Sequence, residues 1–370
     1  MHARKLVILA AALVLSACDG GSGDSAAPLN QSKAVVAAAA TSSDRVNAAV
    51  ASGDPSGLLA EDRATLLSRA ISKANGRRAR TQQILGDIYN SQGAVPDLAL
   101  NVGSGSSIPM LAAGITQAIP FIVSDDGTGI AAIMEDGSGR GMAYGADVLS
   151  WMAGTTKEQQ HLPLFTRAFT WLLTGDADGA LPATIKFSQS GYTSSTVRNF
   201  VTRLGKTPQE VSCNISLPGN TCWQDADLLV FGSSTPNTAA LTELVGTYLK
   251  AGKAVIYMNP GWWESAGGNR VLDALGMKVG GYPGNYFAAA PAYTVSAGRT
   301  AAQSLARGDQ LGRLVTTLQL LGQTSYTHDF TADPTPIDGV TLLRNDLSAY
   351  ENRGKKVFKA ATPLQRLLVL

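Results

Sequence analysis

Imidazole is scarce in this chain, and the scarcity limits its chemistry. The 370 residues include three histidines, His2, His161 and His328. A catalytic zinc is typically held by two histidines four residues apart on one helix face, in the pattern His-Glu-x-x-His, and the glutamate polarises a water molecule. None of the three histidines is followed by glutamate. We therefore assign no catalytic residue and no metal ligand to this sequence.

A serine nucleophile is the main alternative chemistry. Residues 232–236, Gly-Ser-Ser-Thr-Pro, follow an apolar stretch and half resemble the G-x-S-x-G turn that exposes a nucleophilic serine, with proline in place of the second glycine. Ser233 or Ser234 would need a base, and His328 beside Asp329 is a candidate. A serine-type hydrolase is kept as an alternative to the simpler interpretation, a polar loop at a strand end.

An aromatic stretch follows a second apolar run. Residues 257–264 read Tyr-Met-Asn-Pro-Gly-Trp-Trp-Glu, and a glycine-rich segment with two tyrosines lies further on. Tryptophan faces can stack on sugar rings, but one tryptophan in the core and one on the surface is an equal interpretation. A lone carboxylate does not suffice for glycosidase chemistry. The candidate binding surface comprises Trp262, Trp263, Glu264, Tyr282 and Tyr286.

The N-terminus has the pattern of a bacterial lipoprotein signal. A short basic region precedes the apolar run 6–15, which is too short to cross a bilayer core of about 30 Å as a helix. Leu-Ser-Ala-Cys then ends at Cys18, the expected lipidation site. The alternative is an ordinary cleaved signal with an incidental cysteine. We expect a signal peptide over 1–18, a flexible small-residue tether over 19–53 and a membrane anchor in the bacterial cell envelope.

Export places the two remaining cysteines in an oxidising compartment. Cys213 and Cys222 are separated by eight residues that include a Pro-Gly-Asn turn. An even number of cysteines in an exported protein favours a disulfide, and two cysteines without a further ligand nearby do not complete a zinc site. We therefore predict a Cys213–Cys222 disulfide.

Composition indicates a folded protein without nucleic-acid affinity. Apolar residues make up 45% of the chain and charged residues 16%, and the net charge is +2. Such a chain has enough apolar surface for a packed core and no basic field to attract phosphates. The one basic cluster, Arg77, Arg78 and Arg80, is expected to be a solvated helix face.

Periodicity divides the rest of the chain. Residues 54–100 have a helical pattern, with a break between two helices predicted at Asn75-Gly76. An α/β domain is expected over 108–325. Its predicted parts are an antiparallel meander over 119–145, a helix over 158–174, βαβ units with a parallel sheet over 184–275, including a short strand at 210–213, and a helix over 300–321. Residues 326–370 are predicted to be an irregular tail, interpreted as the end of a truncated product.

Several long segments together resemble a known family. Gly139–Gly145 (GRGMAYG), Gln160–Gly175, Asp227–Gly232 and Gly252–Trp263 resemble the N-terminal region of the ImpA-type, enhancin-like bacterial zinc metalloproteases. The resemblance covers roughly residues 50–325. The βαβ part is also distantly similar to the class I glutamine amidotransferase-like fold, in a degenerate form without its nucleophile turn.

The resemblance implies an exported enzyme family that acts on mucin-like, O-glycosylated proteins. Because this sequence lacks His-Glu-x-x-His, we expect the chain not to be catalytic by itself, and zinc only in a missing or separately encoded protease domain. The implied role is substrate engagement or scaffolding, with a glycan or glycoprotein as partner. A stand-alone carbohydrate-binding or adhesion lipoprotein is the first alternative, and the serine-type hydrolase is the second.

Overall fold

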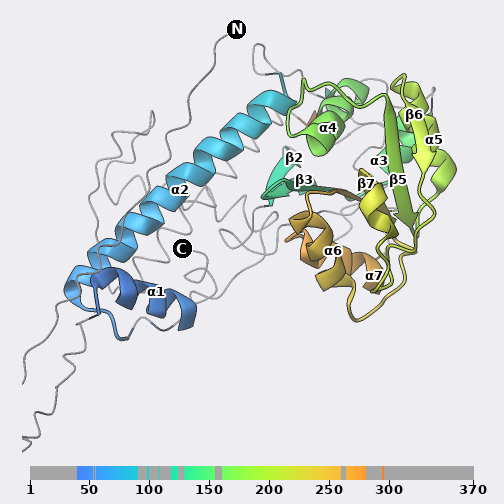
Figure 1. Ribbon diagram of the computed structural model, residues 1–370. Helices are drawn as coiled ribbons and strands as arrows, with labels where there is room; N and C mark the ends of the chain where they lie inside the picture. The colour runs from blue at the N-terminus through green and yellow to red at the C-terminus, as the bar shows by residue number, and fades with distance from the viewer. Residues whose placement is uncertain are drawn as a thin grey trace, which may run out of the picture. The chain divides into compact units, whose positions relative to one another are not determined.

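A computed structural model describes the central part of the chain (Figure 1). The predictions for Cys18, for the aromatic residues of the candidate surface, for the helix over 300–321 and for the tail lie outside the described residues. Within the described part, no helix is long and apolar enough to cross a membrane. The described residues are 40–52, 54, 56–90, 98–99, 108, 118–123, 129–154, 161–259, 264–280 and 294–295.

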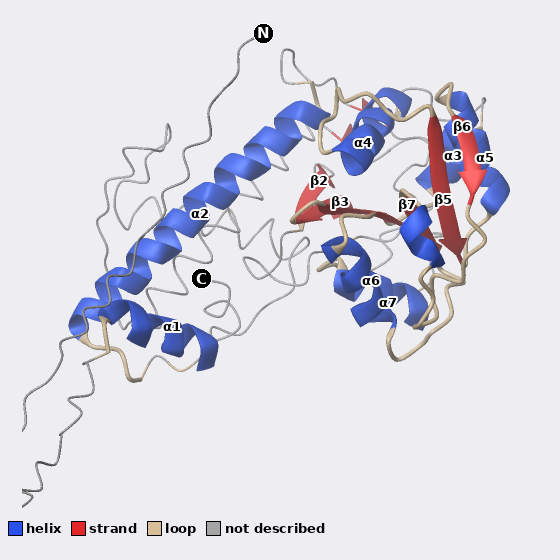
Figure 2. Cartoon of the chain, viewed as in Figure 1, coloured by secondary structure: helices blue, strands red, loops and turns tan. Residues whose placement is uncertain are grey.

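A seven-stranded mixed sheet forms the centre of the fold (Figure 2). The β2–β3 and β3–β4 pairs are antiparallel, and every other pair is parallel. The antiparallel meander, β2 to β4, therefore forms one end of the strand order, and the β4–β8 pair joins it to the parallel strands. In spatial order the strands are β2 (Ile119–Val123), β3 (Gly129–Asp136), β4 (Gly139–Tyr144), β8 (Ala254–Met258), β7 (Leu228–Gly232), β5 (Thr184–Ser190) and β6 (Thr207–Glu210).

Helices cover both faces of the sheet (Figure 1). One group, α3 (Val148–Ala153), α4 (Leu162–Thr174) and α5 (Ser194–Arg203), packs around edge-to-face aromatic rings. In this group the Phe200 ring lies 5.1 Å from that of Phe165 and 5.0 Å from that of Phe169. The other group, α6 (Leu241–Lys250) and α7 (Ala266–Ala274), packs on β7 and β8, whose residues are all buried. Strands buried on both faces explain the continuous apolar runs of the sequence.

The connection from β6 to β7 contains a disulfide-closed loop and a short 3-10 helix, η1 (Cys222–Asp225). Cys213 and Cys222 are bonded in the structure. The Ser188 hydroxyl of β5 donates to the carbonyl of Cys213 at 3.0 Å, and the Tyr248 hydroxyl of α6 donates to the carbonyl of Ile215 at 2.9 Å. The loop thus satisfies its buried carbonyls with hydroxyl groups of the sheet and of α6.

Two helices, α1 (Ser42–Ser52) and α2 (Ala60–Ile88), precede the sheet. Two predictions were wrong here: the flexible tether over 19–53 contains α1, and α2 runs unbroken through Asn75-Gly76. Gly76 is exposed and its position has open space around it, so it costs α2 only about 1 kcal/mol relative to alanine. A 29-residue helix tolerates that loss. A two-stranded sheet pairs β1 (Leu98–Ala99) with β9 (Thr294–Val295).

Two further boundaries differ from the sequence prediction. The helix predicted over 158–174 begins at Leu162, because Pro163 belongs in the first turn, where its missing N–H and its ring are tolerated. The strand predicted over 210–213 lies at 207–210 instead, and the disulfide loop begins directly after it.

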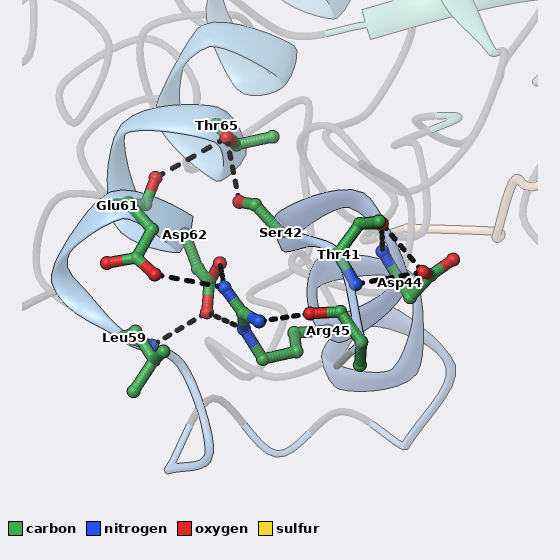
Figure 3. A network of polar contacts seen from close by, with 9 residues as sticks. Thr41, Ser42, Asp44, Arg45, Leu59, Glu61, Asp62 and Thr65 are labelled. Carbon is green, nitrogen blue, oxygen red and sulfur yellow. Dashed lines mark hydrogen bonds and ion pairs between the residues drawn. The ribbon is translucent and has the colours of Figure 1, made fainter. Parts of the chain in front are cut away.

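Asp62 holds α1 against α2 (Figure 3). Its carboxylate accepts from Arg45 Nε at 2.7 Å, from Arg45 Nη2 at 2.8 Å and from the Leu59 N–H at 2.8 Å. The Asp62 side chain is fully buried and Arg45 is 25% exposed. These hydrogen bonds, led by the Arg45 guanidinium, lower the pKa of Asp62. A buried carboxylate without them would pay a large desolvation cost.

Arginines from neighbouring elements satisfy the free carbonyls at helix ends. Arg167 of α4 donates to the carbonyls of Asp87 and Ile88 at the end of α2. Arg140 of β4 donates to Leu172 and Leu173 carbonyls of α4. The cluster predicted as solvated is also engaged, because Arg80 forms a bidentate pair with Glu135 of β3, both bonds being 2.7 Å. Arg140 and Arg167 stabilise helix ends electrostatically as well as by hydrogen bonding, whereas Arg80 links α2 to β3.

Replacing Asp62 by alanine tests the α1–α2 contact. We expect local opening of α1 to become easier, by an amount between the ~1 kcal/mol of an exposed ion pair and the ~3–5 kcal/mol of a buried one. The measurement is amide hydrogen exchange of residues in α1. Glu61→Ala is the matched control, because Glu61 is 62% exposed and contacts the same guanidinium at 3.1 Å. Equal exchange rates in the two variants would contradict the assignment.

Candidate functional site

The carboxyl ends of the parallel strands are the place to look for a site. From β5 the chain moves outward to β6, and it then returns past β5 to β7 and on to β8. The strand order therefore reverses between β5 and β7. Open α/β sheets bind ligands at such a reversal, outside the carboxyl ends of the strands. We call this position the switch point.

Backbone from two loops and from the first turn of α7 makes close contact at the switch point. A Cβ on Gly191, after β5, would lie 2.0 Å from the Thr235 nitrogen. A Cβ on Gly232, at the end of β7, would lie 2.3 Å from the Gly191 oxygen, and one on Gly267 of α7 would lie 1.9 Å from the Thr235 oxygen. No side chain fits at such distances, so glycine is required at all three positions. The loops contact one another directly where a ligand would otherwise lie.

Thr235 fixes the loop that was considered as a nucleophile turn. Its hydroxyl lies 2.8 Å from the Ser190 carbonyl and 2.7 Å from the Gly232 carbonyl, and the side chain is buried. Ser233 is half-buried and Ser234 is exposed. Within the described residues, neither serine has a histidine as hydrogen-bond partner, and His328 lies outside that part. The described geometry therefore favours the simpler interpretation, a polar loop at a strand end.

His161 is a core residue. It is 1% exposed, and its Nε2 lies 3.2 Å from the hydroxyl of Tyr144, the last residue of β4. Its ring also packs near that of Phe165. Burial lowers the pKa of His161 to about 3, so the imidazole is neutral at ordinary pH. In the described structure its Nδ1 has no hydrogen-bond partner. The sequence carried no sign of this pairing.

A second, half-buried polar pair joins two loops. The Tyr192 hydroxyl donates to Oδ1 of Asp147, which also accepts from the Ser150 N–H at 3.3 Å at the start of α3. Burial raises the pKa of Asp147, and the hydrogen bond from Tyr192 opposes that shift. Burial likewise raises the pKa of Tyr192 well above its usual value. The sequence analysis missed both residues, which are ordinary loop residues by type and spacing.

The candidate binding surface is described only at Glu264. This carboxylate is exposed, and its Oε1 accepts from Asn269 Nδ2 at 2.8 Å. Ser265 caps α7 by accepting from the Gly268 N–H at 2.9 Å. On the other side, Asn259 is buried and its N–H donates to the Tyr144 carbonyl at 3.1 Å. Residues 260–263 thus lie in the chain between the buried Asn259 and the exposed Glu264, whose side chain is bonded to Asn269.

Metal chemistry finds no support in the described part of the chain. Among those residues, no group of three or more histidines, cysteines, aspartates or glutamates is placed to hold a metal ion. Three carboxylates at or just after the carboxyl ends of strands, Glu264, Asp147 and Glu210, are engaged by Asn269, Tyr192 and Arg198 respectively.

The fold and its carboxyl edge define a mixed α/β protein with a closed switch point. The family of immunomodulating metalloprotease N-terminal domains matches residues 84–286, which is more than half of the 370 residues. The chain therefore belongs to that family, and the resemblance seen in the sequence is confirmed.

Relatives extend beyond the matched domain. The chain is 30% identical over 345 residues to the immunomodulating metalloprotease of Pseudomonas aeruginosa, covering 88% of this chain and 36% of that protein. The solved structure of the IMPa metallopeptidase from P. aeruginosa has a TM-score of 0.60 at 26% identity, covering 84% of this chain and 35% of that one. A structure of IMPa from the same organism with an O-glycopeptide has a TM-score of 0.63 at 26% identity, covering 89% and 38%. The chain thus spans about a third of their length.

The buried His161 makes stability depend on pH. The unfolded chain binds a proton below pH 6.5, whereas the folded protein does so only near pH 3. The contribution is therefore intact above pH 6.5 and is lost as the pH falls toward 3, with a slope of up to ~1.4 kcal/mol per pH unit. Urea denaturation between pH 7.5 and 4 measures it. We expect His161→Gln to flatten the slope, and an unchanged slope would contradict the assignment.

Gly267→Ala tests the closed edge. The added methyl group would collide with the Thr235 carbonyl, so we expect a loss of about 1–3 kcal/mol in the free energy of unfolding. Gly246→Ala in α6 is the matched control, because nothing lies within 4 Å of the added atom. That change should stabilise by up to ~1 kcal/mol. Urea denaturation compares the two, and a neutral Gly267→Ala would show that the edge is loose.

Proposed function

We propose that this chain is the non-catalytic N-terminal region of an exported metalloprotease directed at O-glycosylated proteins, and that it engages the glycoprotein substrate. One observation carries the proposal. The chain belongs to the family of immunomodulating metalloprotease N-terminal domains, yet its sequence has no histidine followed by glutamate. Zinc and peptide hydrolysis then belong to a protease domain beyond this chain's own residues, and this chain contributes binding or support.

Two solved relatives support a glycan as partner. One is the IMPa metallopeptidase in complex with T-antigen, with a TM-score of 0.60, and another is IMPa with an O-glycopeptide. We place the contact of this chain at the aromatic stretch with Trp262 and Trp263. The anchored residues Asn259 and Glu264 on either side of it support this choice, because fixed ends reduce the entropy lost on binding.

Export and lipidation complete the proposal. Cys18 would carry the lipid anchor, and 19–41 would link it to α1 in the cell envelope. The Cys213–Cys222 disulfide supports an oxidising compartment. The degenerate glutamine amidotransferase-like likeness is retained here as an interpretation. Its support is the parallel part of the sheet.

A stand-alone carbohydrate-binding lipoprotein is the second candidate function. The glycan complexes of the relatives favour it equally, because glycan binding by itself requires no protease domain. The two candidates differ in whether a protease domain acts together with this chain. Restoration of glycoprotein cleavage on mixing the purified chain with the protease region of a relative favours the first.

Binding and hydrolysis of an O-glycopeptide test the proposal directly. We expect Trp262→Ala or Trp263→Ala to weaken binding about tenfold, as loss of ~1.4 kcal/mol of stacking predicts. Leu217→Ala is the control, because Leu217 is 44% exposed in the disulfide loop and should not affect binding. Isothermal titration measures affinity. Zinc-dependent cleavage by the purified chain, abolished by a chelator, would overturn the non-catalytic assignment.

A further inference from the structure

The Tyr192 ring covers the switch point. Tyr192 follows β5 directly after the turn at Gly191, whose φ is +64°. A Cβ on Gly232 would lie 3.0 Å from Cδ2 of the Tyr192 ring, so the ring lies against the carboxyl end of β7. Any larger residue at position 232 would displace the ring. The aromatic side chain therefore adds to the backbone closure already described.

The Tyr192–Asp147 hydrogen bond spans strands that are not neighbours. Tyr192 follows β5 and Asp147 follows β4, and β8 and β7 lie between those strands in the sheet. At ~4.8 Å per strand, three spacings amount to about 14 Å. The hydrogen bond therefore joins loops that follow strands three spacings apart in the sheet, and it ties the β5–α5 loop to the start of α3. The Tyr192 backbone N–H also donates to Gln189 Oε1 at 3.3 Å, which fixes the base of the side chain.

We propose that Tyr192 is the internal occupant of this fold's ligand position, a strap that Asp147 holds closed over the switch point. An apolar side chain could fill the same space at a lower cost, because a half-buried tyrosine bound to a half-buried carboxylate requires both polar groups to be partly desolvated. The strap keeps small molecules out of the switch point. It does not depend on the glycan-binding proposal, whose residues lie in another loop.

Chemical complementation with p-cresol tests the strap, since p-cresol is the tyrosine side chain without its backbone. Tyr192→Ala should lower the Tm by about 5–10 °C. Saturating p-cresol should restore about half of that loss, while shifting the wild type and Tyr192→Phe by less than about 1 °C, since their rings fill the position. Tyr192→Phe should also speed amide exchange in both joined segments, residues 191–194 and 147–150.

Two results would overturn the proposal. One is a Tyr192→Ala protein that p-cresol stabilises no more than it stabilises the wild type. The other, which remains decisive if Tyr192→Ala does not fold, is a Tyr192→Phe protein with unchanged exchange in both segments. We expect Asp147→Asn to speed exchange in both segments, as Tyr192→Phe should, because the ring remains but its charged acceptor is lost.

Discussion

Close backbone contact at the carboxyl edge of the sheet is the constraint on which this structure depends. Gly191, Gly232 and Gly267 bring the loops after β5 and β7 and the first turn of α7 within distances that no Cβ tolerates, and the Thr235 hydroxyl joins the ends of β5 and β7 through two carbonyls. In most open α/β proteins this edge is hollowed for a ligand. Here backbone segments of the described chain are in direct contact at the switch point.

Polar groups near the edge serve mainly to position other parts of the chain. Tyr144 pairs with His161, Asp147 with Tyr192, and Glu264 with Asn269. Arginines elsewhere satisfy the carbonyls of helix ends. In the described part of the chain, these side chains therefore position backbone segments and neighbouring side chains.

The positions of the strands could be predicted from the sequence more accurately than the contacts between the elements. The runs DLLVF and AVIYM lie in β7 and β8, because a strand buried on both faces must be continuously apolar. The family resemblance was also readable, since its segments are long and unusual. The start of α4 was missed although Pro163 signals it. Helix α1 was missed because its small residues resemble a linker and its stability depends on Arg45 and Asp62, which are 17 residues apart.

The site was less predictable than the fold, for a physical reason. The contact between Tyr192 and Asp147 depends on strand order, and the roles of Gly191 and Gly267 depend on which loops meet. Neither has a local pattern in the sequence. The histidine count, in contrast, is a property of composition alone, so it can be read from the sequence without any knowledge of the fold.

Amide hydrogen exchange with and without an O-glycopeptide is the most direct test of a closed edge with binding in the neighbouring loop. The account predicts that the ligand slows exchange in peptides covering residues 259–269. Peptides covering 189–193 and 232–235 should exchange slowly in both states, because their loops are already packed together. Fast exchange at 232–235 that the ligand suppresses, with no change at 259–269, would show that the switch point itself is the binding site and would contradict the account.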